Sequence, residues 1–158
     1  DAALIWVVWQ AVESGGAIAG SVLAPGARST PRAHEYSEQE ALAIRGLYRE
    51  AADSYRTRIV AFPDDVEARL RLGALLANEC NDHGAAVACF TEVRASGNDQ
   101  QRWIASNALI DLYRRAGRRD ELRRELERLG RDFPATAEGR QALRHAEDLA
   151  REPPAGGD

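Results

Sequence analysis

The sequence predicts an all-α fold: an α-solenoid of antiparallel helix hairpins, preceded by an apolar N-terminal helix. The first observation is that Phe62-Pro63 and Phe133-Pro134 are each followed, at the same distance, by a Glu-x-Arg triplet. The two dipeptides lie 71 residues apart, which is about two periods of a helical-hairpin repeat. The second observation is that the residues before each proline repeat as well. The third is an apolar stretch at residues 2–24 that the repeat does not explain.

A turn residue and a small-then-large pair recur at fixed spacings. Gly46, Ala51, Tyr55 and Pro63 have spacings of five, four and eight residues, and Gly117, Leu122, Leu126 and Pro134 have the same spacings. Between them, Ala86 and Phe90 repeat the pair, with Asn98 in the proline position and Gly84 near the turn. Glycine permits the backbone of a tight turn. The first residue of the pair lets two helices approach, and the second fills the gap on the same helical face. Proline then ends the second helix of the hairpin.

The first helix of each hairpin carries a pattern of its own. Leu72-Gly73 with Leu76, and Leu109-Ile110 with Tyr113, precede the second and third turns. Together these motifs resemble the tetratricopeptide repeat (TPR) family, whose pattern is W-x2-L-G-x2-Y, then A-x3-F, then P. The resemblance implies about three degenerate repeats and a terminal capping helix over residues 32–151. An ordinary helical bundle with accidental spacing is the alternative.

The predicted helices are 37–45, 47–61, 65–79, 84–95, 100–116, 119–131 and 137–151. Ser37 and Glu40 have the spacing of a capping box, and Asp64-Asp65 is predicted to cap the helix that follows Pro63. Extra residues at 80–84 and 95–101 are predicted to lengthen loops. The predicted domain organisation is an apolar helix at 1–25, a linker at 26–31, a repeat domain at 32–151 and a disordered tail at 152–158.

Composition and motif content argue against catalysis and against nucleic-acid binding. The formal net charge is −4, which disfavours a dedicated nucleic-acid surface. No Ser-His-Asp or Cys-His arrangement, phosphate loop or carboxylate pair is readable, so no enzymatic activity, cofactor or small-molecule substrate is expected. His34, His83 and His145 lack the spacing of metal ligands, and a disulfide between Cys80 and Cys89 is not expected. Arginine is the only cationic residue besides histidine and accompanies abundant alanine and leucine, as in proteins from GC-rich bacteria.

Residues 114–131 contain eight arginines, interleaved with four acidic residues. We interpret this segment as a solvated helix surface with ion pairs between residues four apart. The alternative is a basic face that binds an acidic partner or lipid headgroups.

Residues 2–24 have the length and apolar character of a single membrane span. Trp6 and Trp9 suit the bilayer interface, and Gly16 and Gly20 form a small-residue stripe for helix packing. Glu13 is unfavourable in lipid unless it faces a protein partner. We therefore predict an anchor in the bacterial inner membrane. The arginines that follow it favour a cytoplasmic repeat domain, and a periplasmic one is the alternative. Other interpretations are a retained signal segment and a soluble helix that packs on the repeats.

The TPR resemblance also implies a concave groove, lined by the first helix of each hairpin, that binds a partner helix or extended segment. By position in the repeat, the groove residues are Tyr36, Glu40, Leu70, Ala74, Asn78, Asn107, Asp111, Arg114 and Arg115. Tyr36 and Glu40 stand where some family members have the lysine and asparagine of a carboxylate clamp, so chaperone tails are not expected partners.

The function that follows is a non-catalytic protein–protein interaction scaffold. Its membrane anchor makes it an accessory or assembly subunit of a multi-protein membrane complex, with other protein subunits and the lipid bilayer as partners. The first alternative is a soluble TPR adaptor whose apolar helix packs on the repeats. The second is a small enzyme.

Overall fold

A computed structural model describes residues 36–151, which lie in the second of two units, Asp1–Arg32 and Ala33–Asp158, into which the chain divides. The described part is all-α and contains no strand. Its helices are α2 (Ser37–Ile44), α3 (Tyr48–Ala61), α4 (Val66–Asn78), α5 (His83–Ser96), α6 (Asp99–Arg115), α7 (Arg119–Asp132) and α8 (Ala137–Arg151). The seven helices predicted over residues 37–151 are confirmed, each end lying within one residue of its predicted position.

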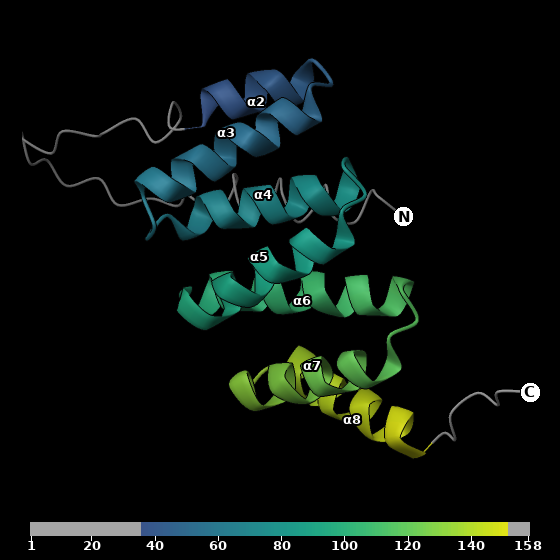
Figure 1. The fold of residues 1–158 in the computed structure, drawn as a ribbon. Helices are drawn as coiled ribbons and strands as arrows, with labels where there is room; N and C mark the ends of the chain where they lie inside the picture. Colours follow the sequence, from purple (N-terminus) through teal and green to yellow (C-terminus); the bar gives the residue numbers. More distant parts are fainter. Residues whose placement is uncertain (1–35, 152–158) are drawn as a thin grey trace, which may run out of the picture. The chain divides into compact units, whose positions relative to one another are not determined.

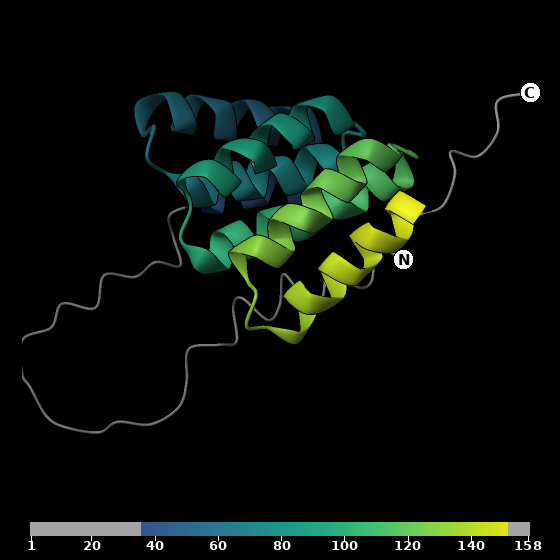
Figure 2. The same cartoon turned by 90° about the horizontal axis from the view of Figure 1, so that it is seen from below.

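Within this unit the helices follow one another in space in the order of the sequence. Each helix packs against the next one along the chain, and α4 also contacts α6 (Figures 1 and 2). Gly46 and Gly117 lie at the α2–α3 and α6–α7 turns with φ of 75° and 66°, a conformation that favours glycine. The α4–α5 turn differs from the prediction, because Asn81 adopts the positive φ of 53° while Gly84 lies in the first turn of α5.

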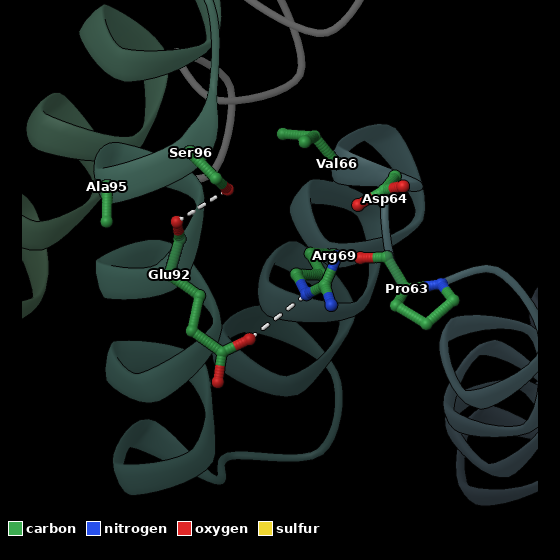
Figure 3. A pocket seen from close by; sticks show the side chains of 7 residues that line it. All are labelled: Pro63, Asp64, Val66, Arg69, Glu92, Ala95 and Ser96. Atoms are coloured by element: carbon green, nitrogen blue, oxygen red, sulfur yellow. Dashed lines mark hydrogen bonds and ion pairs between the residues drawn. The ribbon is translucent and has the colours of Figure 1, made fainter.

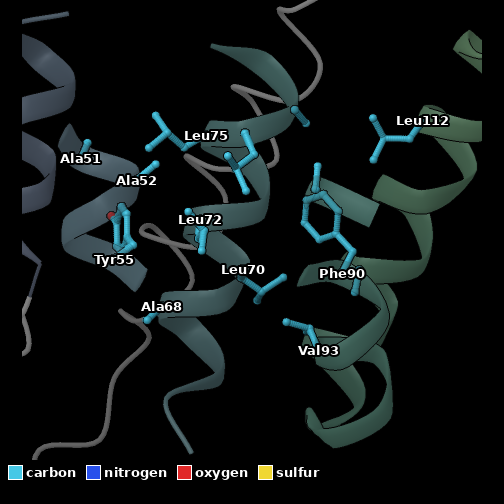
Figure 4. Packing of buried hydrophobic residues seen from close by; sticks show 14 of the residues in the cluster. Ala51, Ala52, Tyr55, Ala68, Leu70, Leu72, Leu75, Phe90, Val93 and Leu112 are labelled. Atoms are coloured by element: carbon cyan, nitrogen blue, oxygen red, sulfur yellow. The ribbon is translucent and has the colours of Figure 1, made fainter. Parts of the chain in front are cut away.

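The small-then-large pairs lie in the core, as their spacing predicts. Ala51 and Ala86 are fully buried, and the large partners Tyr55 and Phe90 keep only 5% and 4% of their surface exposed. Figure 4 shows Ala51, Tyr55 and Phe90 among the buried residues of this core. The glycine of the Leu-Gly motif has a packing reason, since a Cβ on Gly73 would lie 3.0 Å from the Phe90 ring. A first cluster of buried residues joins α2 to α6, and a second joins α6 to α8.

Two local predictions are wrong. Tyr36, and not Ser37, is the N-cap of α2, and its side chain makes no capping hydrogen bond. Glu40 pairs with Arg71 on α4. The extra residues predicted to lengthen a loop at 95–101 belong mostly to helices, with α5 continuing to Ser96 and α6 starting at Asp99.

Two side-chain caps explain where α4 and α6 begin. The carboxylate of Asp65 accepts a hydrogen bond from the Ala68 amide at 2.9 Å, which confirms the predicted cap of α4. Asn98, in the position of the missing third proline, forms a reciprocal capping box with Gln101. A capping residue thus starts α6 where the other hairpins have proline.

None of the helices between residues 36 and 151 is long and apolar enough to cross a bilayer. The predicted apolar helix at 1–25, the linker at 26–31 and the tail at 152–158 lie outside the described residues. The same holds for the predicted packing residues of that helix, which are Trp6, Trp9, Glu13, Gly16 and Gly20.

Candidate interaction surface

The predicted groove residues divide into a buried and an accessible set. Tyr36 and Leu70 are each only 8% exposed and belong to the core cluster that joins α2 to α6. Half-buried are Glu40, Ala74, Asn107 and Asp111, and exposed are Asn78, Arg114 and Arg115. A side chain in the core contacts a partner only if the packing opens, so the accessible set is confined to Glu40 on α2 and to residues of α4 and α6.

Tyr36 joins the first hairpin to α4. Its hydroxyl donates a hydrogen bond to Asp65 Oδ1 at 2.7 Å. The guanidinium carbons of Arg58 and Arg71 each lie 4.6 Å from the centroid of its ring. Tyr55 packs beside it with a centroid separation of 6.1 Å. Cation–π and hydrogen-bond contacts from α3 and α4 therefore hold the residue that precedes α2.

The charged side chains around Tyr36 form ion pairs with one another. Burial raises the pKa of Asp65, but hydrogen bonds from Tyr36, the Ala68 amide and Arg58 outweigh it and hold this pKa below its usual range. Arg71 forms ion pairs with Glu67 at 2.9 Å and with Glu40 at 2.5 Å. Because Glu40 lies on α2, the second ion pair connects the first helices of two successive hairpins.

On α6, the polar groups predicted to face a partner interact within the helix. The Asn107 amide donates to the Trp103 carbonyl at 2.8 Å, and Asp111 pairs with Arg115 at 2.7 Å. A partner that used these side chains would replace existing interactions. The exposed side chains of Asn78 and Arg114 are accessible without such an exchange.

The arginines of segment 114–131 mostly interact with neighbours in the chain. Arg118 pairs with Glu121 and Arg123 with Glu127, each at 2.5 Å. Arg115 pairs with Asp111, and Arg124 donates to the Asp120 carbonyl. Arg119 instead donates to the carbonyl of Leu149 on α8. These contacts favour the interpretation as a solvated helix surface over that of a basic docking face.

A buried ion pair that was not predicted from the sequence joins two hairpins. Glu125 on α7 is 4% exposed and pairs through Oε2 with Arg94 on α5. Burial raises the pKa of Glu125, although Arg94 and the Ser106 hydroxyl act in the opposite direction. The sequence does indicate that Glu125 is buried, because Glu125 lies on the same helical face as Leu122 and Leu129 and so interrupts the apolar stripe of α7.

A shallow pocket of about 390 Å³ lies at the open end of the α4–α5 hairpin (Figure 3). Its lining residues are Pro63, Asp64, Val66, Arg69, Glu92, Ala95 and Ser96. Arg69 Nε donates to Glu92 at 3.0 Å, and its other arm donates to the Pro63 carbonyl. The Ser96 hydroxyl donates to the Glu92 carbonyl at 2.9 Å. The contact between Arg69 and Glu92 therefore joins α4 to α5 beside this pocket.

Metal-ligating side chains and thiols are the other groups that could carry chemistry. In the part of the chain that the structure describes, no three His, Cys, Asp or Glu side chains gather as a metal-ligand set. Cys80 and Cys89 are unpaired and half-buried. No family model matches the chain, and no curated protein matches it. What the chain does is therefore inferred from its own residues and their geometry.

Proposed function

We propose that this chain is a non-catalytic, TPR-like helical-repeat scaffold, anchored in the bacterial inner membrane by residues 2–24. It serves as an accessory or assembly subunit of a multi-protein membrane complex. The repeat domain is an α-solenoid of three degenerate hairpins with α8 as its cap. Its partners are other protein subunits, and its lipid contact is the bilayer around the apolar segment.

The observation that carries this proposal is the equivalence of the three hairpins. The pairs Ala51/Tyr55, Ala86/Phe90 and Leu122/Leu126 come from the second helix of successive hairpins, and all six side chains are buried. Equivalent core positions at a regular interval are typical of stacked helical repeats. Such repeats generally present the surfaces of successive helices to other proteins, which supports a scaffold function.

The partner surface in this proposal is the accessible set on the first helices. It extends from Glu40 on α2 through Ala74 and Asn78 on α4 to Asp111 and Arg114 on α6. Both signs of charge and an amide are present, so a polar helix or extended segment of mixed charge suits it better than a purely acidic or basic one. Tyr36 and Leu70 are buried and do not belong to this surface.

Alkaline carbonate extraction tests the anchor. Carbonate releases peripheral proteins and leaves spanning segments in the membrane, so we expect the full chain to remain in the pellet. Release of the full chain by carbonate alone would remove the anchor from the proposal and favour the soluble adaptor.

Glu13 offers a test of assembly in the membrane. A carboxylate within a span is tolerated when it faces a protein partner, so Glu13→Leu is expected to weaken the complex without releasing the chain from membranes. Ser14→Leu is the matched control, because the next residue of a helix points about 100° away. Equal effects of the two variants on complex recovery would contradict a specific role for Glu13.

A further inference from the structure

The pocket at the open end of the α4–α5 hairpin lies between two helix ends (Figure 3). Pro63 and Asp64 come just before α4, and Val66 is its first residue, whereas Ala95 and Ser96 belong to the last turn of α5. The volume of about 390 Å³ is within the range of ligand pockets, and part of the wall is apolar. The partner surface proposed above lies on the first helices and does not include this pocket.

The side chains that line this pocket carry one unmatched negative charge. Arg69 is their only cation, and it is already held by Glu92 at 3.0 Å and by the Pro63 carbonyl. Asp64 is exposed, and its carboxylate forms no hydrogen bond or ion pair in the described part of the chain. Because Arg69 balances Glu92, the charge of Asp64 remains open to a ligand.

The start of α4 does not offer the pocket an anion site. Helix N-termini attract anions through amides that lack a partner within the helix. Here the Val66 amide donates to the Asp64 carbonyl at 2.9 Å, and the Ala68 amide donates to the Asp65 carboxylate at 2.9 Å. Two aspartates thus offset the positive end of this helix, and an anion would meet their negative charge.

The end of α5 adds acceptors to the pocket. The Gly97 amide donates to the Val93 carbonyl, and in the described chain no hydrogen bond beyond α5 reaches the carbonyls of Ala95 and Ser96. The last carbonyls of a helix carry the negative end of its dipole. The Ser96 hydroxyl donates to the Glu92 carbonyl at 2.9 Å, so its oxygen is still able to accept. This end of the pocket therefore favours a cation with several donors.

We propose that this pocket takes the side chain of an arginine that a partner protein presents. The inference rests on the proposed function, because it requires a partner protein. Asp64 forms the ion pair, the carbonyls at the end of α5 accept hydrogen bonds, and Pro63 and Val66 pack against the aliphatic stem. A guanidinium suits acceptors on two separate helices, because its donors point outward in one plane.

Binding of argininamide to the full chain in neutral detergent tests the pocket. Citrullinamide is the matched probe, since it has nearly the same shape and no charge. In two-dimensional amide NMR spectra, we expect argininamide to shift the signals of residues 64–66 and 95–97, and citrullinamide to leave them nearly unchanged. The shifts should weaken in 1 M salt, which screens exposed charges. Equal shifts with the two probes, or shifts confined to other residues, would overturn the proposal.

Three variants separate the pocket from general attraction to acidic side chains. Asp64→Asn should weaken argininamide binding about two- to fivefold, as expected for a partly exposed ion pair. Asp120→Asn is the matched control, because Asp120 is an exposed aspartate of α7 that does not line the pocket. Ala95→Leu fills the pocket without changing its charge and should also weaken binding. Equal binding by the two Asn variants, or unchanged binding by Ala95→Leu, would contradict the assigned site.

Recovery of the complex from native membranes in mild detergent separates this inference from the proposed function. We expect the wild type and Asp120→Asn to be recovered with partner proteins, and Asp64→Asn to be recovered with less of them. A wild-type complex that Asp64→Asn leaves unchanged would overturn this inference and leave the proposed function standing. A wild-type chain recovered without any partner would overturn the proposed function and this inference with it.

Discussion

Replacing Arg94 by leucine tests the buried link between the second and third hairpins. The Arg94 and Glu125 side chains are only 16% and 4% exposed, and they join α5 to α7. Arg94→Leu keeps much of the aliphatic bulk but leaves the carboxylate of Glu125 buried without its cation. The unfolded chain, in contrast, hydrates that carboxylate fully. The substitution therefore lowers the free energy of unfolding.

The burial of the pair sets the magnitude of the loss. Removing one partner of a buried ion pair costs about 3–5 kcal/mol. The lower end applies here, because Arg94 retains some contact with water and Glu125 can take up a proton instead of remaining charged. A loss of about 3 kcal/mol corresponds to a decrease in melting temperature of about 10–15 °C for a domain of this size.

Urea unfolding followed by far-ultraviolet circular dichroism, on the full chain in mild detergent, measures this loss. Arg56→Leu is the matched control, since Arg56 and Asp53 form an ion pair on the surface with side chains 48% and 74% exposed. That control should cost less than about 1 kcal/mol. In Arg94→Leu/Glu125→Leu no charge is left buried, and stability should largely recover. A single variant no less stable than the control, or a double variant no more stable than Arg94→Leu, would refute the reasoning.

Three further expectations concern pH, helix packing and the contact of Tyr36 with α4. Because the pKa of Glu125 is raised in the folded state, the stability of the wild type should fall as pH rises from the ordinary glutamate pKa through the raised one; urea titrations across that window should show this component missing in Glu125→Gln. A Cβ on Gly139 would overlap the Phe133 carbonyl, whereas one on Gly84 meets nothing nearer than 3.8 Å; calorimetry should find Gly139→Ala strongly destabilising and Gly84→Ala neutral or stabilising by up to about 1 kcal/mol. Tyr36→Phe removes a hydrogen bond to a carboxylate and should cost about 1.5–3 kcal/mol in urea unfolding; a cost near zero would mean that this hydrogen bond does not contribute to stability.

Helix positions and the main core pairs could be predicted because they depend on local spacing. Gly46 and Gly117 were predicted as turn residues from the pattern alone, and both have a positive φ. The pair spacing of four residues placed Ala51 and Tyr55 on one buried face. The prediction was wrong at the α4–α5 turn, where Asn81 and not Gly84 has the positive φ. Asparagine adopts a positive φ more readily than most residues, so Asn81 was also a candidate for the turn residue.

Contacts between distant residues could not be predicted from spacing. Tyr36, one of the predicted groove residues, contacts Arg58, Asp65 and Arg71, which are 22 to 35 positions later in the chain. The ion-pair partner of Glu125 could not be predicted from spacing either, because Arg94 lies 31 residues earlier in the chain. Only the interruption of the apolar stripe by Glu125 indicated burial. Only the three-dimensional structure thus shows which charged side chains of a repeat protein form buried ion pairs and which lie on the surface.

The central claim, that the chain is a scaffold subunit of a membrane complex, is tested most directly by the particle in which it is extracted from native membranes. Membranes would be solubilised in mild detergent and the chain purified by size, with its co-migrating proteins identified and quantified. We expect a particle much larger than the 17.3 kDa chain, containing other membrane proteins in a fixed ratio to it. Recovery of the chain alone, in a detergent micelle as a monomer, would contradict the claim.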